Sequence, residues 1–204
     1  MNKRFWPGLI LMAALIPVVG LGQTQDAVIK TCTQCHGSDG VSDQPHVAHL
    51  NGQLADAFID TLAAYANRSR PTTVPAHTQL PKALYADIAN FYAAHQDKPR
   101  PRQATDPARV EKGALIYGNR CEKCHVDNGR ESDGEAPRLA AQNLEFLVNQ
   151  TLAYKAGVRK LPFMMDRAYA GLSEDDLVSV AHFFAAQDMH APAVSRKKHR
   201  RSNN

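Results

Sequence analysis

All four cysteines of this 204-residue chain fall in two copies of one pattern, Cys-x-x-Cys-His, at 32–36 and 121–125. Two thiols spaced in this way can each add to a vinyl group on one edge of a porphyrin, and the next residue then brings an imidazole to the iron. A thioredoxin-like motif has no need of that histidine, and a four-cysteine zinc site would have to join pairs 89 residues apart. The pattern therefore predicts two covalently attached haems c, with thioether links at Cys32, Cys35, Cys121 and Cys124 and iron ligands at His36 and His125.

The distance between the two motifs is also the period of an internal repeat, which indicates two copies of one structural unit. A shift of 89 residues aligns leucines, glutamines, tyrosines and arginines, namely Leu50 with Leu139, Gln53 with Gln142, Tyr65 with Tyr154 and Arg70 with Arg159. Further along, the shift becomes 92 and aligns Leu80 with Leu172 and Phe91-Tyr92 with Phe183-Phe184. We expect one domain over residues 24–96 and a second over 107–188, joined by a polar, proline-interrupted linker at 97–106.

The hydrophobic periodicity of both copies predicts helices. Apolar residues recur at i, i+3, i+4 and i+7 over residues 54–65 and again over 144–152. Ser173, followed by three acidic residues, is a typical N-cap for a last helix that buries Leu177, Val180, Ala181 and Phe184. No β-type alternation of comparable length occurs, so the expected fold class is all-α.

The N-terminal residues 1–22 have the order of a secretory signal peptide: Lys3 and Arg4, an apolar stretch, then Gly20 and Gly22. An uncleaved anchor helix is the alternative, but Pro7 and Pro17 argue against it. Cleavage would place the protein in an exported, oxidising compartment. The net charge of +4 comes from this leader and from a basic tail within 189–204; without their seven basic residues, 17 basic side chains face 20 acidic ones. Nucleic acid is therefore not an expected partner.

The motif from Cys32 to Gly40, the sequence from Leu50 to Gln53 and the segments 171–177 and 181–184 together resemble a dihaem class I cytochrome c of the cytochrome c4 family. The resemblance implies two tandem cytochrome c domains packed about a pseudo-twofold axis. It also implies a periplasmic electron carrier, not an enzyme, which passes single electrons between a respiratory donor complex and a terminal oxidase or reductase. Two alternatives remain: the cytochrome subunit of a flavoprotein sulfide dehydrogenase, and a small haem oxidoreductase that uses haem 1. The basic tail is either a disordered end or a peripheral contact with an anionic partner or membrane.

The resemblance also indicates the second axial ligand of haem 2. The family's ligand methionine lies seven residues before the leucine that opens the last helix, and here that leucine is Leu172, which selects Met165. Met164 is the alternative, in what we expect to be a loop between two helices.

Haem 1 cannot have such a ligand from its own domain, because no methionine occurs between Met12 and Met164. The loop expected at residues 70–77 offers His77, whose imidazole is the best available ligand there. His46, His49 and an open iron site are the alternatives. Methionine ligation raises the haem potential relative to two imidazoles, so we expect haem 2 to have the higher potential.

The family further implies that a carbonyl accepts a hydrogen bond from each proximal imidazole, which places Pro137 in this role in domain 2 and Ala48 at the equivalent position of domain 1. Arg70 and Arg159 are candidates to pair with haem propionates, or else are surface arginines.

Overall fold

The computed structural model describes residues 24–132 and 136–190, and within these ranges it contains helices and no strand. The all-α prediction is therefore confirmed. The helices are α1 (Gln25–His36), α2 (Ala55–Ala66), α3 (Pro75–Gln79), the short 3₁₀ helix η1 (Lys82–Leu84), α4 (Tyr85–Ala93), α5 (Pro107–Arg120), α6 (Val126–Gly129), α7 (Leu144–Lys155), α8 (Phe163–Tyr169) and α9 (Glu174–Ala185). The expected signal peptide at 1–22 lies outside the described residues, as does most of the basic tail.

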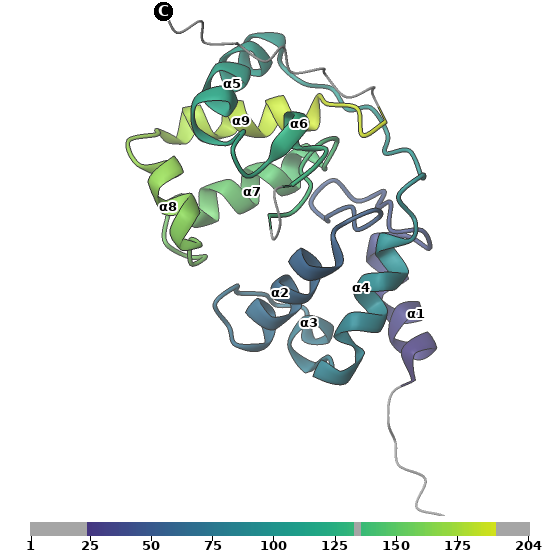
Figure 1. Cartoon of the computed structure of the whole chain (residues 1–204). Coiled ribbons are helices and arrows are strands. Elements are labelled where there is room, and N and C mark those ends of the chain that lie inside the picture. Colours follow the sequence, from purple (N-terminus) through teal and green to yellow (C-terminus); the bar gives the residue numbers. More distant parts are fainter. Residues whose placement is uncertain (1–23, 133–135, 191–204) are drawn as a thin grey trace, which may run out of the picture.

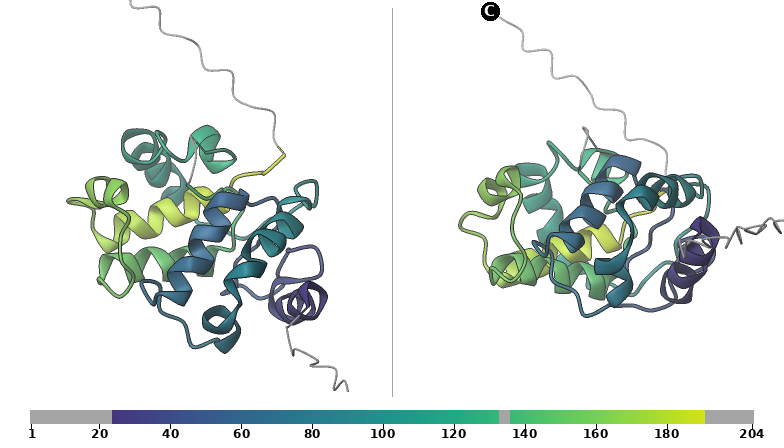
Figure 2. Two further views of the ribbon diagram at one scale, coloured as in Figure 1. Left: turned by 60° about the horizontal axis from the view of Figure 1, so that its bottom comes forward. Right: turned by 90° about the horizontal axis from the view of Figure 1, so that it is seen from below.

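The helices form two adjacent groups, α1–α4 and α5–α9, connected by the extended segment that precedes α5 (Figure 1). Each group has its own core: one centred on Val28, Phe58, Ile88 and Tyr92, the other on Tyr117, Leu147, Phe183 and Phe184. Two further directions of view also show the groups packed side by side (Figure 2). The two groups correspond to the two copies of the internal repeat.

Equivalent hydrogen bonds confirm that the sequence repeat is also a structural repeat. The carbonyl of Gly40 accepts from Leu50 N at 2.7 Å, and the carbonyl of Gly129 accepts from Leu139 N at 2.8 Å, both pairs being related by the 89-residue shift. In the same way Gly52 N donates to Tyr92 O and Ala141 N donates to Phe184 O, each at 2.9 Å. The first two bonds close the segment after each Cys-x-x-Cys-His motif on itself, and the last two tie that segment to the last helix of its group.

The predicted buried face of α9 is confirmed, because Leu177, Val180, Ala181 and Phe184 are all buried. In α2 the same periodicity buries Ala57, Phe58 and Leu62. Each group also packs its first helix against its last, α1 on α4 and α5 on α9. The second contact is much closer because Gly113 of α5 lies against α9: a Cβ on this residue would be only 2.1 Å from the carbonyl oxygen of Ser179. The equivalent residue in the first group is Thr24, which only caps α1.

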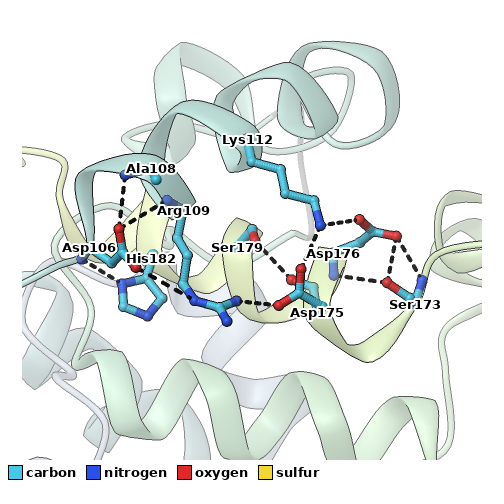
Figure 3. Close-up of polar contacts among 9 residues, drawn as sticks. All are labelled: Asp106, Ala108, Arg109, Lys112, Ser173, Asp175, Asp176, Ser179 and His182. Atoms are coloured by element: carbon cyan, nitrogen blue, oxygen red, sulfur yellow. Dashed lines mark hydrogen bonds and ion pairs between the residues drawn. The ribbon is translucent and has the colours of Figure 1, made fainter.

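A polar network joins the first turn of α9 to α5 (Figure 3). Ser173 and Asp176 form a capping box, in which Asp176 N donates to Ser173 Oγ at 3.1 Å and Ser173 N donates to Asp176 Oδ2 at 2.9 Å. Lys112 Nζ lies 2.6 Å from Asp175 Oδ2 and 2.7 Å from Asp176 Oδ1, and Arg109 Nη1 lies 2.7 Å from Asp175 Oδ1. Hydrogen bonds from these cations and from Ser173 hold the pKa values of Asp175 and Asp176 below their usual range.

Acidification should therefore loosen the α5–α9 contact. A carboxylate whose pKa is lower in the folded than in the unfolded state stabilises the fold above the unfolded value, and this stability is lost as the pH falls through the folded value. Asp176→Asn should make the free energy of unfolding less dependent on pH below about 4, as measured by urea unfolding at a series of acidic pH values. Asp87→Asn, which changes an exposed first-turn carboxylate of α4, is the matched control and should keep the wild-type acid dependence. An unchanged slope in Asp176→Asn would contradict this account.

No helix among residues 24–132 and 136–190 combines the length and hydropathy needed to cross a bilayer.

Candidate haem sites

Both motif histidines have one ring nitrogen already engaged by a main-chain carbonyl. His36 Nδ1 lies 2.9 Å from Ala48 O, and His125 Nδ1 lies 3.0 Å from Pro137 O, so the expectation about these two carbonyls is confirmed. A carbonyl can only accept, so each Nδ1 carries the hydrogen and each Nε2 keeps a lone pair for a metal. Burial lowers the pKa of His36, which favours the neutral, metal-binding form of the imidazole.

The four cysteines stand beside these histidines, and no disulfide joins any two of them. Cys32 and Cys35 lie in the last turns of α1, whereas Cys121 and Cys124 lie in the turn between α5 and α6. Burial raises the pKa of the Cys32 thiol, and that of the Cys121 thiol to about 11. Both pairs line the cavity described below, so both are placed for thioether links to a group bound in it.

The two segments expected to be loops around His77 and Met165 are instead short helices. His77 lies in α3 and Met165 in α8. The prediction of loops was wrong because a proline starts each helix: Pro75 is in the first turn of α3, and Pro162 is the N-cap of α8. Proline has its φ fixed near the helical value and lacks only an N–H that the first turn leaves unpaired anyway.

His77 faces the motif histidine of its own group. The ring centroids of His36 and His77 are 6.2 Å apart, with the ring planes inclined at 42°. A metal–nitrogen bond is about 2 Å long, and the ring centre of an imidazole lies roughly 1.1 Å beyond its nitrogen. Two imidazoles that bind one metal from opposite sides would therefore have ring centroids about 6 Å apart. His77 Nδ1 lies 3.1 Å from Thr72 Oγ1, and the His77 ring stacks on Tyr65 at 4.6 Å. These contacts hold the ring and leave Nε2 available.

The other candidates for a second iron ligand differ in their solvent exposure. Met165 is half-buried, whereas Met164 is 54% exposed, and both side chains line the cavity. His46 is exposed. His49 is completely buried, with its Nδ1 accepting from Ser42 N at 3.0 Å.

Two glutamines connect the groups by reciprocal bonds between equivalent positions. Gln53 donates to Arg138 O at 2.6 Å and accepts from Arg138 N at 3.0 Å. Gln142 donates to His49 O at 2.9 Å and accepts from His49 N at 2.6 Å. Gln53 and Gln142 are 89 residues apart, as are His49 and Arg138, so the two bridges join equivalent positions of the repeat. Side chains outside the motifs thus fix the position of one group against the other.

Arg100, from the linker, is buried at the same interface. Its Nε donates to Asn51 Oδ1 at 2.9 Å, its Nη2 to Asn51 O at 2.8 Å and its Nη1 to Ala140 O at 2.8 Å. Asn51 and Ala140 are also equivalent positions of the repeat. Burial and the neighbouring Arg138 lower the pKa of Arg100 to about 9.

One continuous cavity of about 2190 Å³ is lined by both Cys-x-x-Cys-His motifs, His77, Met164 and Met165. Pockets for ordinary small ligands measure about 300–1,000 Å³, so this cavity has room for two large groups. His49 Nε2, Tyr92 Oη and Arg138 Nε are buried atoms without a hydrogen-bond partner in the described structure, and all three residues line the cavity. The site thus combines thiols, imidazoles and unpartnered donors, which fits a covalently bound, anionic porphyrin in each group.

Arg70 and Arg159 also line the cavity, each against a tyrosine of its own group. The Arg70 guanidinium lies 4.6 Å from the Tyr65 ring centre, and that of Arg159 lies 4.1 Å from the Tyr154 ring centre. Both donate to Gln150 Oε1 at 2.9 Å. Neither is in an ion pair with a carboxylate among the described residues, so both remain available to an anion in the cavity.

No protein-family model matches the chain. Cytochrome c4 of Pseudomonas aeruginosa is 25% identical over 197 residues, which cover 90% of this chain and 94% of that protein. Cytochrome c-552 of Acidithiobacillus ferridurans is 26% identical over 174 residues, 74% of this chain and 75% of that one. The solved structure of Acidithiobacillus ferrooxidans cytochrome c4 matches with a TM-score of 0.65 at 25% identity, covering 77% of this chain and 99% of that structure. Thiosulfate dehydrogenase (TsdBA) of Marichromatium purpuratum matches with a TM-score of 0.66 at 25% identity, over 78% of this chain and 36% of that one.

The repeated helical unit and its Cys-x-x-Cys-His site define a class I cytochrome c, in which haem is the electron-carrying group. With both units on one chain, the protein is similar over most of its length to the cytochromes c4 among the relatives just described.

Proposed function

We propose that this protein is a periplasmic dihaem cytochrome that passes single electrons between a respiratory donor and a terminal acceptor. The observation that carries the proposal is the shared cavity, because both haem motifs open into it and the two haems would therefore lie close to each other. A bound haem supplies a reversible one-electron couple at its iron. The protein's own residues hold the two haems, set their axial ligands and fix their relative position.

Each haem has a complete set of candidate residues on this chain. Cys32, Cys35 and His36 would hold haem 1, and Cys121, Cys124 and His125 would hold haem 2. The domains would then be residues 24–96 and 107–188, joined by the linker at 97–106, with one Cys-x-x-Cys-His motif in each. The leader at 1–22 supports export to the periplasm, where such haem attachment would be completed.

His77 is the proposed second ligand of haem 1. The centroid distance of 6.2 Å to His36 matches two imidazoles that share one metal, and both rings keep Nε2 free for it. Burial, with the nearby His36 and Arg70, lowers the pKa of His77 to about 4, so the ring is neutral at pH 7 and able to bind iron. His49 is a weaker candidate because it directly follows Ala48, whose carbonyl engages the His36 imidazole, so His49 would lie on the same side of a bound haem as His36.

Met165 is the proposed second ligand of haem 2, giving the two haems unlike ligand sets. A methionine sulfur opposite histidine raises the haem potential relative to two imidazoles. Electrons would therefore enter at haem 1 and leave from haem 2. The redox partners would be a donor complex and a terminal oxidase or reductase, and the basic tail at 189–204 provides a candidate contact with an anionic surface.

A redox titration of the purified holoprotein, compared with Met165→Ala and Met164→Ala variants, tests this assignment. The wild type should contain two haems and titrate in two waves, and one haem should show the near-infrared charge-transfer band of methionine-ligated iron. Met165→Ala should abolish this band and lower the upper wave, because its sulfur is lost. Met164→Ala, which changes the more exposed neighbour, is the control and should retain both features. A single wave in the wild type, or a lower potential for haem 2, would contradict the asymmetric carrier.

The likeness to thiosulfate dehydrogenase supports one second candidate, an electron-accepting partner of a sulfur-oxidising enzyme. The chain covers 36% of that protein, so any such role would need a separate catalytic component. Reduction of the holoprotein by thiosulfate alone would favour the oxidoreductase alternative, whereas reduction only in the presence of a partner enzyme would favour the carrier.

A further inference from the structure

We propose that His49 binds a propionate of haem 1 through its Nε2–H group, and that Arg138 has the same role towards haem 2 through Nε–H. The inference rests on the proposed function, since it requires both haems. It assigns a role to two residues that are neither thioether nor iron ligands.

The hydrogen bonding of His49 fixes which ring nitrogen is the donor. Its Nδ1 accepts a hydrogen bond from Ser42 N, so the ring hydrogen of the neutral imidazole must be on Nε2. That N–H has no partner in the described structure, although the residue is 0% exposed and lines the cavity. A buried N–H group of this kind needs an acceptor, and a group bound in the cavity that His49 lines could supply one.

The backbone around His49 is held on both sides. Ala48 O contacts the His36 imidazole at 2.9 Å, so His49 follows the residue that positions the proximal ligand of haem 1. The amide of Gln142 then binds both His49 N and His49 O. Because its main chain and its Nδ1 are both fixed, the ring offers Nε2–H in one direction.

Arg138 repeats this arrangement in the other group. It occupies the position equivalent to His49, its main chain is bound by Gln53, and its Nη1 donates to Gly52 O at 2.8 Å. Its Nε is buried without a partner and the residue lines the same cavity. The side chains differ between the copies, but each presents one unpartnered N–H donor from the same structural position.

The surrounding charges identify the acceptor as an anion. Arg70, Arg138 and Arg159 line the cavity, and none of them is in an ion pair with a carboxylate within residues 24–132 and 136–190. Buried guanidinium groups require a counter-charge or good hydrogen bonds. The propionates of the two haems, which the proposed function places in the cavity, would provide these anionic oxygens.

Two substitutions of His49 separate the propionate contact from the Ser42 contact. His49→Asn retains a side-chain oxygen that can accept from Ser42 N but is too short to put a donor at the place of Nε2. His49→Gln puts an amide N–H near that place but loses the Nδ1 acceptor.

Loss of the donor leaves more negative charge near the iron and favours the oxidised state. His49→Asn should therefore raise the oxidised-to-reduced ratio of haem 1, at a fixed applied potential, about threefold, which corresponds to a reduction potential about 28 mV lower. The same substitution should shift the infrared bands of ¹³C-labelled propionates. His49→Gln should stay close to wild type.

Each result has a defined meaning. Two haems per chain, with unchanged potentials and propionate bands in His49→Asn, would overturn the proposal and leave the proposed function intact. A change in His49→Gln but not in His49→Asn would assign the effect to Ser42 and overturn it equally. Fewer than two haems in the wild type would refute the proposed function itself. Arg138→Met provides an independent test if His49→Asn does not fold. It should raise the oxidised-to-reduced ratio of haem 2 and leave that of haem 1 unchanged. An unchanged ratio for haem 2 would overturn the proposal for Arg138.

Discussion

Replacing His77 with alanine should convert haem 1 from a low-spin, six-coordinate site to a high-spin site that binds carbon monoxide. The imidazole of His77 is placed 6.2 Å from that of His36 by its contacts with Thr72 and Tyr65. No methionine of the same domain can replace it, since none lies between Met12 and Met164. The visible spectrum and carbon monoxide titration should show the change in half of the haem.

A methionine at position 77 gives the complementary result. His77→Met should raise the potential of haem 1 by on the order of 0.1 V, a fraction of the roughly 0.8 V range that axial ligands cover. The gap between the two redox waves should then narrow. His46→Ala, which changes an exposed histidine of the same domain, is the control and should leave spectrum and potential unchanged. A low-spin haem 1 that persists in His77→Ala would show that another side chain binds the iron.

Replacing Arg100 with methionine should weaken the attachment of one domain to the other. The substitution leaves three buried acceptors without their donor, two on Asn51 and one on Ala140. Each unsatisfied buried acceptor costs about 1–3 kcal/mol, so we expect a loss of about 3 kcal/mol in the free energy of unfolding. Denaturation followed by haem absorbance should change from one transition to two, because the domains no longer unfold together.

A second arginine of the linker, Arg102, provides the control substitution for Arg100→Met. Arg102 is two residues away, with its side chain 95% exposed and only a 3.9 Å contact to Asp188. Exposed ion pairs of this kind contribute little to stability, so Arg102→Met should unfold like the wild type. Equal effects of the two substitutions would show that linker charge, and not the buried bonds, governs the stability.

The sequence predicted most of what depends on local pattern. Helix periodicity identified the buried face of α9, and Ser173 was correctly identified as its N-cap. The repeat pointed to equivalent positions that share the same main-chain hydrogen bonds. These features follow from residues close together in the chain, where period and capping chemistry act directly.

The sequence did not predict the features that depend on packing between the domains. Arg100 lies in a segment whose prolines and charges are typical of an exposed linker, yet it is buried. Gln53 and Gln142 aligned in the repeat, but their reciprocal bonds depend on how the two groups face each other. No hydrophobic period indicated the short helices that contain His77 and Met165, because a helix of five or seven residues is too short to show one. Only the prolines at their starts could have indicated them.

The contacts of Arg100 bear on how a tandem protein of this kind differs from a symmetric dimer. In a homodimer of single-haem chains, any residue near the twofold axis would be present twice, once from each subunit. Two guanidinium groups would then compete for the two equivalent carbonyls that Arg100 alone contacts, on Asn51 and Ala140. A single chain with one linker places one arginine there and no copy of it. Covalent fusion thus permits an interface residue that exact symmetry would exclude, and it allows the two halves of the protein to become chemically different.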